Sequence, residues 1–237
     1  MRVCGGLGGV ARLRYLGHAA FDVELEGFDG RKRRILLDPW LENPLSPVKP
    51  SDYRGARVDY IFVTHDHGDH LGNAVELARA TGAKVVAVYE LAEELSKEGV
   101  QAVGANIGGP LALEGIQAVF TPALHSSSKG APTGVVVRGR DTAVYHAGDT
   151  GLFGDMRLIG ELYAPDVALL PIGGHFTMGV VEALKAVELL RPRLAIPMHY
   201  NTFPEIRADP EKFKELVEAT TRTKVVVLKP GDYVEYP

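Results

Sequence analysis

The chain has 237 residues, 46% of them hydrophobic and 24% charged, and a formal net charge of −4. This composition can bury a large core and excludes an intrinsically disordered protein, while the single cysteine excludes a disulfide scaffold. The mildly acidic balance argues against a nucleic-acid partner, which requires a basic surface. Because no hydrophobic run reaches the roughly 18–20 residues that span a bilayer, and no secretory signal opens the chain, we expect a cytoplasmic protein without membrane contact.

The first ten residues predict a flexible tail, and residues 11–237 predict a single domain. Four glycines lie in the tail, at Gly5, Gly6, Gly8 and Gly9. The amino-acid sequence of residues 6–11 matches a dinucleotide-binding motif, but that motif needs a preceding strand, which we do not expect here. Cys4 lies in the same tail and is expected to be inert.

The first half of the domain is predicted to be rich in strands. The predicted strands are Leu13–Leu16, Ala20–Leu25, Arg33–Leu37, Val58–Val63 and Lys84–Val88, with turns at Gly17 and Phe28–Gly30. Residues Gly68–Ala80 place Leu71, Val75 and Ala78 at helical spacing, so one helix is predicted there. A second helix is predicted over Leu91–Glu98.

In the second half, strands come to alternate with helices. The predicted strands are Ile116–Thr121, Gly134–Val137, Thr142–His146, Val167–Leu170, Leu194–Pro197 and Lys224–Leu228, and the predicted helices are Val180–Leu190 and Pro210–Ala219. A meander followed by alternating strands and helices predicts an α/β domain with two sheets flanked by helices. No repeat or Ser/Gly linker divides it.

The predicted strand Val58–Val63 ends in the segment THDHGDH, residues 64–70. In an extended chain, the side chains of His65 and His67 point the same way. Gly68 permits a sharp turn that would bring Asp69 and His70 back toward them. Imidazole and carboxylate groups at this density indicate a metal site.

Three further donors each follow a predicted strand: His125, Asp149 and His199. A lone histidine at a strand end is usually structural, but three such positions beside the first motif are stronger evidence. One zinc ion takes about four ligands, so the additional donors raise the possibility of a second metal.

These segments, in this order, resemble the metallo-β-lactamase fold hydrolases. The segments GHAAF (17–21), LDPWLENP (37–44), YHAGDTGLFGDM (145–156), PIGGHFTMG (171–179) and MHYNTFP (198–204) are similar to a largely uncharacterised group of metal-dependent hydrolases related to L-ascorbate-6-phosphate lactonase. The resemblance runs from about residue 11 to the end. It implies a four-layer αββα sandwich of two mixed sheets flanked by helices.

The resemblance also implies two divalent metal ions. One would be held by His65, His67 and His125, and the other by Asp69, His70 and His199, with Asp149 bridging. A shared hydroxide would attack the substrate, with Asp69 as the catalytic residue that orients it. Zinc is preferred, although the nitrogen and oxygen ligands also suit Mn²⁺ or Fe²⁺. Relatives with redox di-iron centres usually carry Glu where this chain has His67, which favours hydrolysis.

Three histidines remain outside that ligand set. His18 is a candidate for substrate contact or for support of a ligand side chain, with a structural role as the alternative. His175 is a candidate for substrate contact, and His146 is expected to be structural. With both metals, two carboxylates and one hydroxide, the site would keep one positive charge, so an anionic substrate is expected.

We therefore expect a hydrolase that cleaves a lactone or other ester of an anionic or phosphorylated small molecule. A phosphodiesterase and a non-catalytic metal-binding or sensory protein are the alternatives, and a homo-oligomer is possible. The chain has no G-x-S-x-G elbow and no phosphate-binding P-loop, which argues against a serine hydrolase and an NTPase.

Overall fold

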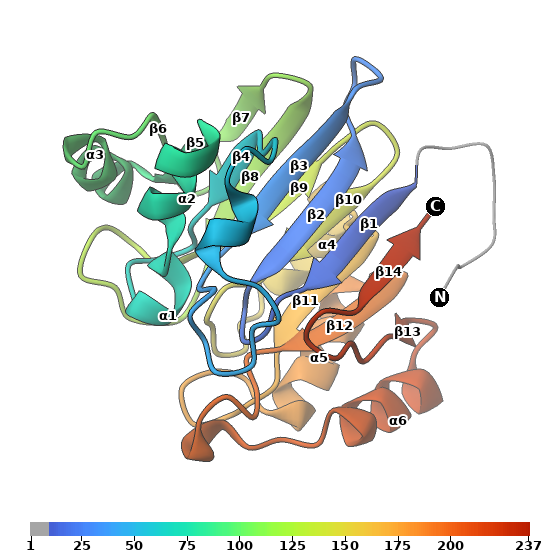
Figure 1. The fold of residues 1–237 in the computed structure, drawn as a ribbon. Helices are drawn as coiled ribbons and strands as arrows, with labels where there is room; N and C mark the ends of the chain where they lie inside the picture. The colour runs from blue at the N-terminus through green and yellow to red at the C-terminus, as the bar shows by residue number, and fades with distance from the viewer. Residues whose placement is uncertain (1–9) are drawn as a thin grey trace.

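The structure, a computed structural model, describes residues 10–237, so nearly all of the predicted tail lies outside the described residues. Two seven-stranded sheets pack face to face (Figure 1). The first sheet has the order β14 (Tyr233–Tyr236), β1 (Ala11–Tyr15), β2 (Phe21–Glu26), β3 (Lys32–Leu37), β4 (Tyr60–Phe62), β5 (Lys84–Val88) and β6 (Ala102–Ala105). The second has the order β13 (Lys224–Val225), β12 (Leu194–Met198), β11 (Val167–Pro171), β10 (Ala143–His146), β9 (Thr133–Arg138), β8 (Ile116–Pro122) and β7 (Pro110–Leu113).

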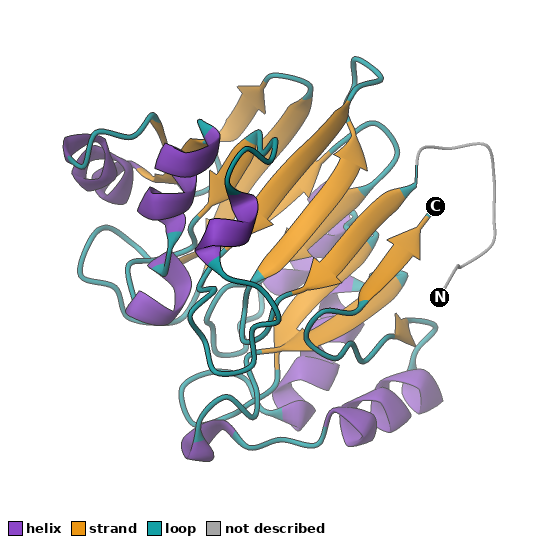
Figure 2. Ribbon diagram, viewed as in Figure 1, coloured by secondary structure: helices purple, strands orange, loops and turns teal. Residues whose placement is uncertain are grey.

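Helices cover the outer faces of both sheets (Figure 2). The helices α1 (Gly68–Leu71), α2 (Ala74–Thr81) and α3 (Tyr89–Lys97) lie beside the first sheet, and α4 (Met156–Tyr163), α5 (Val180–Leu190) and α6 (Pro210–Thr220) lie beside the second. Two short 3₁₀ helices cover Pro50–Tyr53 and Pro204–Ile206. The expected four-layer αββα sandwich is confirmed, and no helix among residues 10–237 is long and apolar enough to cross a membrane.

Strands β4, β11 and β12 are apolar throughout because both of their faces are buried. In β4, Tyr60 and Phe62 belong to the core between the two sheets, whereas Ile61 belongs to the core under α2 and α3. Side chains alternate between the faces of a strand, so a run without polar residues serves both cores at once.

The single helix predicted over Gly68–Ala80 is wrong, because the segment forms two helices, α1 and α2. The chain breaks at Gly72, whose φ is +44°, and a Cβ there would lie 2.4 Å from the Cα of Trp40. Asn73 follows, and its side-chain oxygen accepts a hydrogen bond from the backbone N–H of Leu41. The segment around Trp40 therefore packs into the break. Gly68 begins α1 without a positive φ, and the turn expected there does bring His70 back toward His65, since potential ligand atoms of the two lie within 4.8 Å of each other.

Three strands and one helix escaped prediction: β6, β7, β14 and α4. Two predicted strands are shorter than expected, since β4 lacks Val58 and Val63, and β13 ends at Val225. The remaining predicted elements agree with the structure to within two residues at each end.

The carboxyl ends of parallel strands from both sheets meet at one edge of the sandwich. Strands β3 and β4 run parallel in the first sheet, and β10, β11 and β12 run parallel in the second. The segments that follow these strands contain the motif 64–70, Asp149 and His199. The topology therefore brings together residues that lie more than a hundred positions apart in the chain.

Candidate metal centre

The predicted ligand side chains converge at this edge in three overlapping groups, within each of which potential ligand atoms lie within 4.8 Å of one another. The groups are His18, Asp69, His70 and His199; His65, His67 and His125; and His65, His70 and Asp149. All seven residues proposed as ligands occur in these groups, and His18 joins them.

Asp149 lies at the centre of the cluster and is almost completely buried. Its Oδ1 is 3.1 Å from Nε2 of His70, and its Oδ2 is 3.1 Å from Nε2 of His199 and 3.5 Å from Nε2 of His125. One carboxylate thus faces histidines from three separate segments. This is the arrangement that a bridging ligand between two cations requires.

Several atoms of the cluster are buried without a hydrogen-bond partner among residues 10–237. They are Nε2 of His70, Oδ1 of Asp149, and both ring nitrogens of His199. Native proteins pair the great majority of their buried polar atoms. Unpaired nitrogen and oxygen atoms that converge on one point are suitable ligands for a divalent cation. The residues present therefore fit a metal centre.

Asp38, which sequence reasoning left without a role, holds two of the histidines in place. Its Oδ2 accepts hydrogen bonds from Nδ1 of His70 and from the Thr64 hydroxyl, each at 2.7 Å. The Thr64 oxygen in turn lies 3.1 Å from Nδ1 of His65 and accepts its proton. Both histidines therefore carry their ring proton on Nδ1 and present a free Nε2 to the centre.

Burial alone would raise the pKa of Asp38, but the charge and hydrogen bond of His70 lower it to about 2. The carboxylate is therefore ionised at neutral pH. A sequence signal for Asp38 did exist, since it directly follows β3 as His199 directly follows β12.

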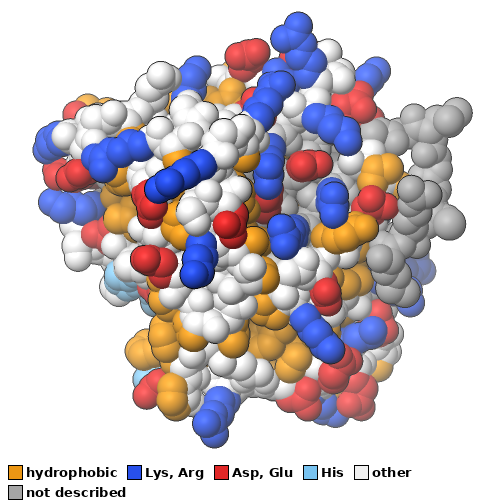
Figure 3. Space-filling view, in the orientation of Figure 1, with side chains coloured by type: hydrophobic (Ala, Val, Ile, Leu, Met, Phe, Trp, Pro, Cys, Tyr) orange, Lys and Arg blue, Asp and Glu red, His pale blue; other side chains and the backbone are white. Residues whose placement is uncertain are grey.

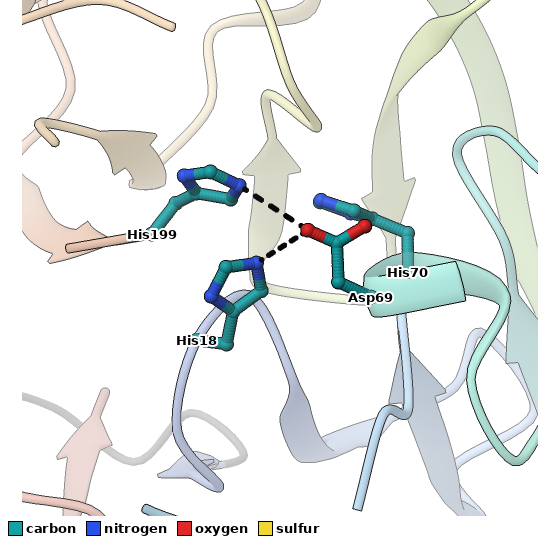
Figure 4. Close-up of side chains that lie close together, drawn as sticks. All are labelled: His18, Asp69, His70 and His199. Atoms are coloured by element: carbon teal, nitrogen blue, oxygen red, sulfur yellow. Dashed lines mark hydrogen bonds and ion pairs between the residues drawn. The ribbon is translucent and has the colours of Figure 1, made fainter. Parts of the chain in front are cut away.

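His18 lies beside Asp69, with its ring directed at that carboxylate (Figure 4). It is fully buried, with Nε2 3.1 Å from Oδ2 of Asp69 and Nδ1 3.0 Å from the hydroxyl of Thr202. Burial would raise the pKa of Asp69, yet the hydrogen bond from His18 holds it well below its ordinary value. The geometry makes His18 a positioning residue for Asp69.

The other two histidines are not part of the three ligand groups. His175 is exposed beside Phe176, at a ring distance of 4.3 Å, and does not line the cavity described below. His146 is buried and uses both ring nitrogens, since Nε2 donates to the carbonyl of Ala19 and Nδ1 accepts from the N–H of Gly148. These bonds agree with the expected structural role of His146.

A cavity of about 310 Å³ opens onto the cluster. It is lined by His67, Asp69, His125, Ser126, Asp149, Phe176, His199 and Phe203. A larger cavity of about 500 Å³ lies at the carboxyl ends of α5 and α6, but none of the clustered histidines or aspartates lines it. Because it combines ligand side chains with access, the smaller cavity is the candidate active site.

The buried histidines predict that the metal-free protein is less stable in acid. Burial lowers the pKa of His18 to about 4 and that of His65 to about 3, and also lowers those of His125 and His146. Burial would lower the pKa of His70 too, but Asp149 and Asp38 raise it, so His70 does not add to this effect. Between about pH 6.5 and pH 4, the unfolded chain therefore binds more protons, and the free energy of unfolding decreases as the pH is lowered.

Urea unfolding in the presence of a chelator, repeated across this pH range, measures the effect. In His18→Gln, one titrating group is lost, and the pH slope is expected to be smaller by up to about 1.4 kcal/mol per pH unit. A flat pH profile of the wild-type protein would contradict the prediction.

Comparison with known proteins agrees with the fold and the site. A family model described as a β-lactamase superfamily domain matches residues 33–200. A UPF0173 metal-dependent hydrolase from Staphylothermus marinus is 64% identical over 228 residues, which are 96% of this chain and the whole of the relative. The solved structure of Igni18, a metallo hydrolase from Ignicoccus hospitalis, is 50% identical with a TM-score of 0.90, covering 96% of this chain and 99% of the other.

The fold also occurs with a different chemistry. CmlA, a diiron β-hydroxylase from Streptomyces venezuelae, has a TM-score of 0.70 and 15% identity, over 99% of this chain and 55% of the other. That likeness shows the fold alone, so the assignment of activity rests on the closer relatives and the family model. The chain belongs to the metallo-β-lactamase superfamily and is a metal-dependent hydrolase.

Proposed function

We propose that the protein holds two divalent cations, zinc by preference, and hydrolyses a lactone or other ester of a small molecule. One ion would be held by His65, His67 and His125, the other by Asp69, His70 and His199, and Asp149 would bridge them. The observation that supports two ions is the position of Asp149, whose Oδ2 lies near His125 of the first proposed ligand set and near His199 of the second. The lactone preference rests on the family resemblance alone.

When bound, such cations lower the pKa of a coordinated water toward 7 and polarise a carbonyl oxygen. The chain's own residues would orient the ligand side chains and the attacking water. Asp38 would keep Nε2 of His70 free of a proton directly, and that of His65 through Thr64.

Asp69 is the carboxylate that substrate can reach. Its side chain is 26% exposed, against 4% for Asp149 and 0% for Asp38. It lines the cavity, and His18 fixes the direction of one of its oxygens. Asp69 is thus placed to orient the attacking water and to accept its proton.

Two other functions use the same residues. A phosphodiesterase would place a phosphoryl group where the ester carbonyl is proposed to bind, and a metal-dependent sensor would bind metal without turnover. Hydrolysis of bis(4-nitrophenyl) phosphate would favour the phosphodiesterase. Full metal loading without turnover of any ester or diester would favour the metal-dependent sensor.

Replacement of Asp69 by alanine is expected to reduce ester or lactone hydrolysis by about 10²–10⁴-fold, because the oriented proton acceptor is lost. Elemental analysis of protein purified without an affinity column should find about two metal ions per wild-type chain. Asp66→Ala is the matched control, since Asp66 belongs to the same motif but accepts hydrogen bonds from Ser127 and Ser128 instead. Wild-type turnover by Asp69→Ala would disprove the proposed role.

A further inference from the structure

Apolar side chains surround the mouth of the candidate active site. Phe176 lines the cavity although it is 53% exposed, and Leu124, next to His125, is 58% exposed. Phe203 lines the cavity near Phe176 and His199, and its ring stacks on that of Trp40 at 5.9 Å. Exposed large apolar side chains that gather beside a cavity mark a binding surface.

Among residues 10–237, no Lys or Arg lines this cavity. Lys129 lies on the loop that follows His125, but its Nζ is 3.9 Å from a carboxylate oxygen of Glu94. On the face seen in Figure 3, basic and acidic side chains are interspersed. Proteins that recognise a phosphate group use Arg, Lys or backbone N–H groups for it.

Asp38 removes the charge argument for an anionic substrate. Two divalent ions carry four positive charges, and the expected excess of one counted only Asp69, Asp149 and a hydroxide. Asp38 is fully buried and hydrogen-bonded directly to His70, so its carboxylate also belongs to the centre. With it included, the loaded centre is neutral.

We infer that the ester or lactone carries an uncharged aromatic group, which binds between Phe176 and Phe203 while the reactive carbonyl faces Asp69 and Asp149. This inference rests on the proposed function, and it replaces the expectation of a phosphorylated substrate. Aromatic rings favour stacked or edge contacts with other rings, and the exposed ring of Phe176 supplies such a surface without rearrangement.

Three γ-butyrolactones with the same reactive ring test it on the metal-loaded full chain. One carries a γ-phenyl group, one a γ-phosphonooxymethyl group, and one no substituent. The kcat/KM of the phenyl compound is expected to exceed that of the phosphorylated one by at least about tenfold, because removing the apolar phenyl group from water contributes favourable binding free energy. Equal values, or a preference for the phosphorylated compound, would overturn the inference while leaving the proposed lactonase in place.

Binding is measured separately through Trp40, the only tryptophan in the chain. Its fluorescence should change on addition of 2-phenyltetrahydrofuran, which has no hydrolysable bond, and not on addition of tetrahydrofurfuryl phosphate at the same concentration. If no lactone is hydrolysed, the proposed function fails, and this titration still decides the inference. A response to the phosphate compound alone, or to neither compound, contradicts it.

Phe176→Ala is expected to reduce the preference for the phenyl lactone over the phosphorylated lactone by about tenfold. Phe28→Ala is the matched control, because Phe28 is similarly exposed, at 49%, but lies in the turn between β2 and β3. The control should keep the wild-type preference. An unchanged preference in Phe176→Ala would contradict the inference.

Discussion

Asp38→Ala is expected to lower metal affinity by about 10–100-fold and the free energy of unfolding by about 3–5 kcal/mol. The replacement removes the acceptor for the Thr64 N–H, the Thr64 hydroxyl and Nδ1–H of His70, all of which are buried. Both proposed metal positions depend on this one carboxylate, since it orients His70 directly and His65 through Thr64. Titration with a competing chelator measures the affinity, and urea unfolding of the metal-free protein measures the stability.

Asp38→Asn separates the two effects. An asparagine fills the same space, but if its amide nitrogen takes the place of Oδ2 it donates toward Nδ1 of His70, which must then accept. The His70 proton moves to Nε2, where it opposes metal binding. We therefore expect a large loss of metal affinity with a smaller loss of stability than in Asp38→Ala.

Asp22→Ala is the control for stability alone. Asp22 is also buried in the first sheet, but it accepts hydrogen bonds from Arg34 and Tyr53 rather than from the residues of the metal cluster. It should destabilise the protein without changing metal affinity. Wild-type metal affinity in both Asp38 variants would rule out the role assigned to that residue.

Asp149→Ala is expected to leave no more than one metal ion per chain and to reduce hydrolysis by about 10³-fold or more. Without this carboxylate, the Nε2 atoms of His70 and His199 lose their shared negative neighbour. Elemental analysis and initial rates on the same preparation give the two readouts.

Asp166→Ala is the matched control for Asp149. Asp166 precedes β11 at the opposite edge of the sheet, where it accepts hydrogen bonds from the N–H of Ala143 and the hydroxyl of Tyr236. That variant should keep its metal content. Two ions per chain in Asp149→Ala would show that the carboxylate does not bridge them.

The sequence was sufficient to predict several of the polar residues that meet, because they follow apolar strands. His65 and His67 follow β4, and His199 follows β12, so alternation and strand ends place them at one edge of the sandwich. The class of fold followed from the same runs of apolar residues. These signals are local, and a single chain displays them directly.

Other features depend on contacts between distant segments, which no local pattern reveals. The role of Asp38 depends on hydrogen bonds to residues 26 and 32 positions away, and that of His18 on a bond to Asp69, 51 positions away. The break at Gly72 depends on the approach of Trp40. Strand β14 is too short and too polar to be recognised before its partner is known.

The pairing of β14 with β1 also has a consequence for how the protein is made. Ala11 pairs with Tyr236, so the first sheet joins the two ends of the domain. On a ribosome, β1 would emerge long before β14, and until then it forms an exposed edge of the nascent sheet. His199 emerges late as well. Metal capture is therefore expected to follow synthesis of the domain rather than accompany it.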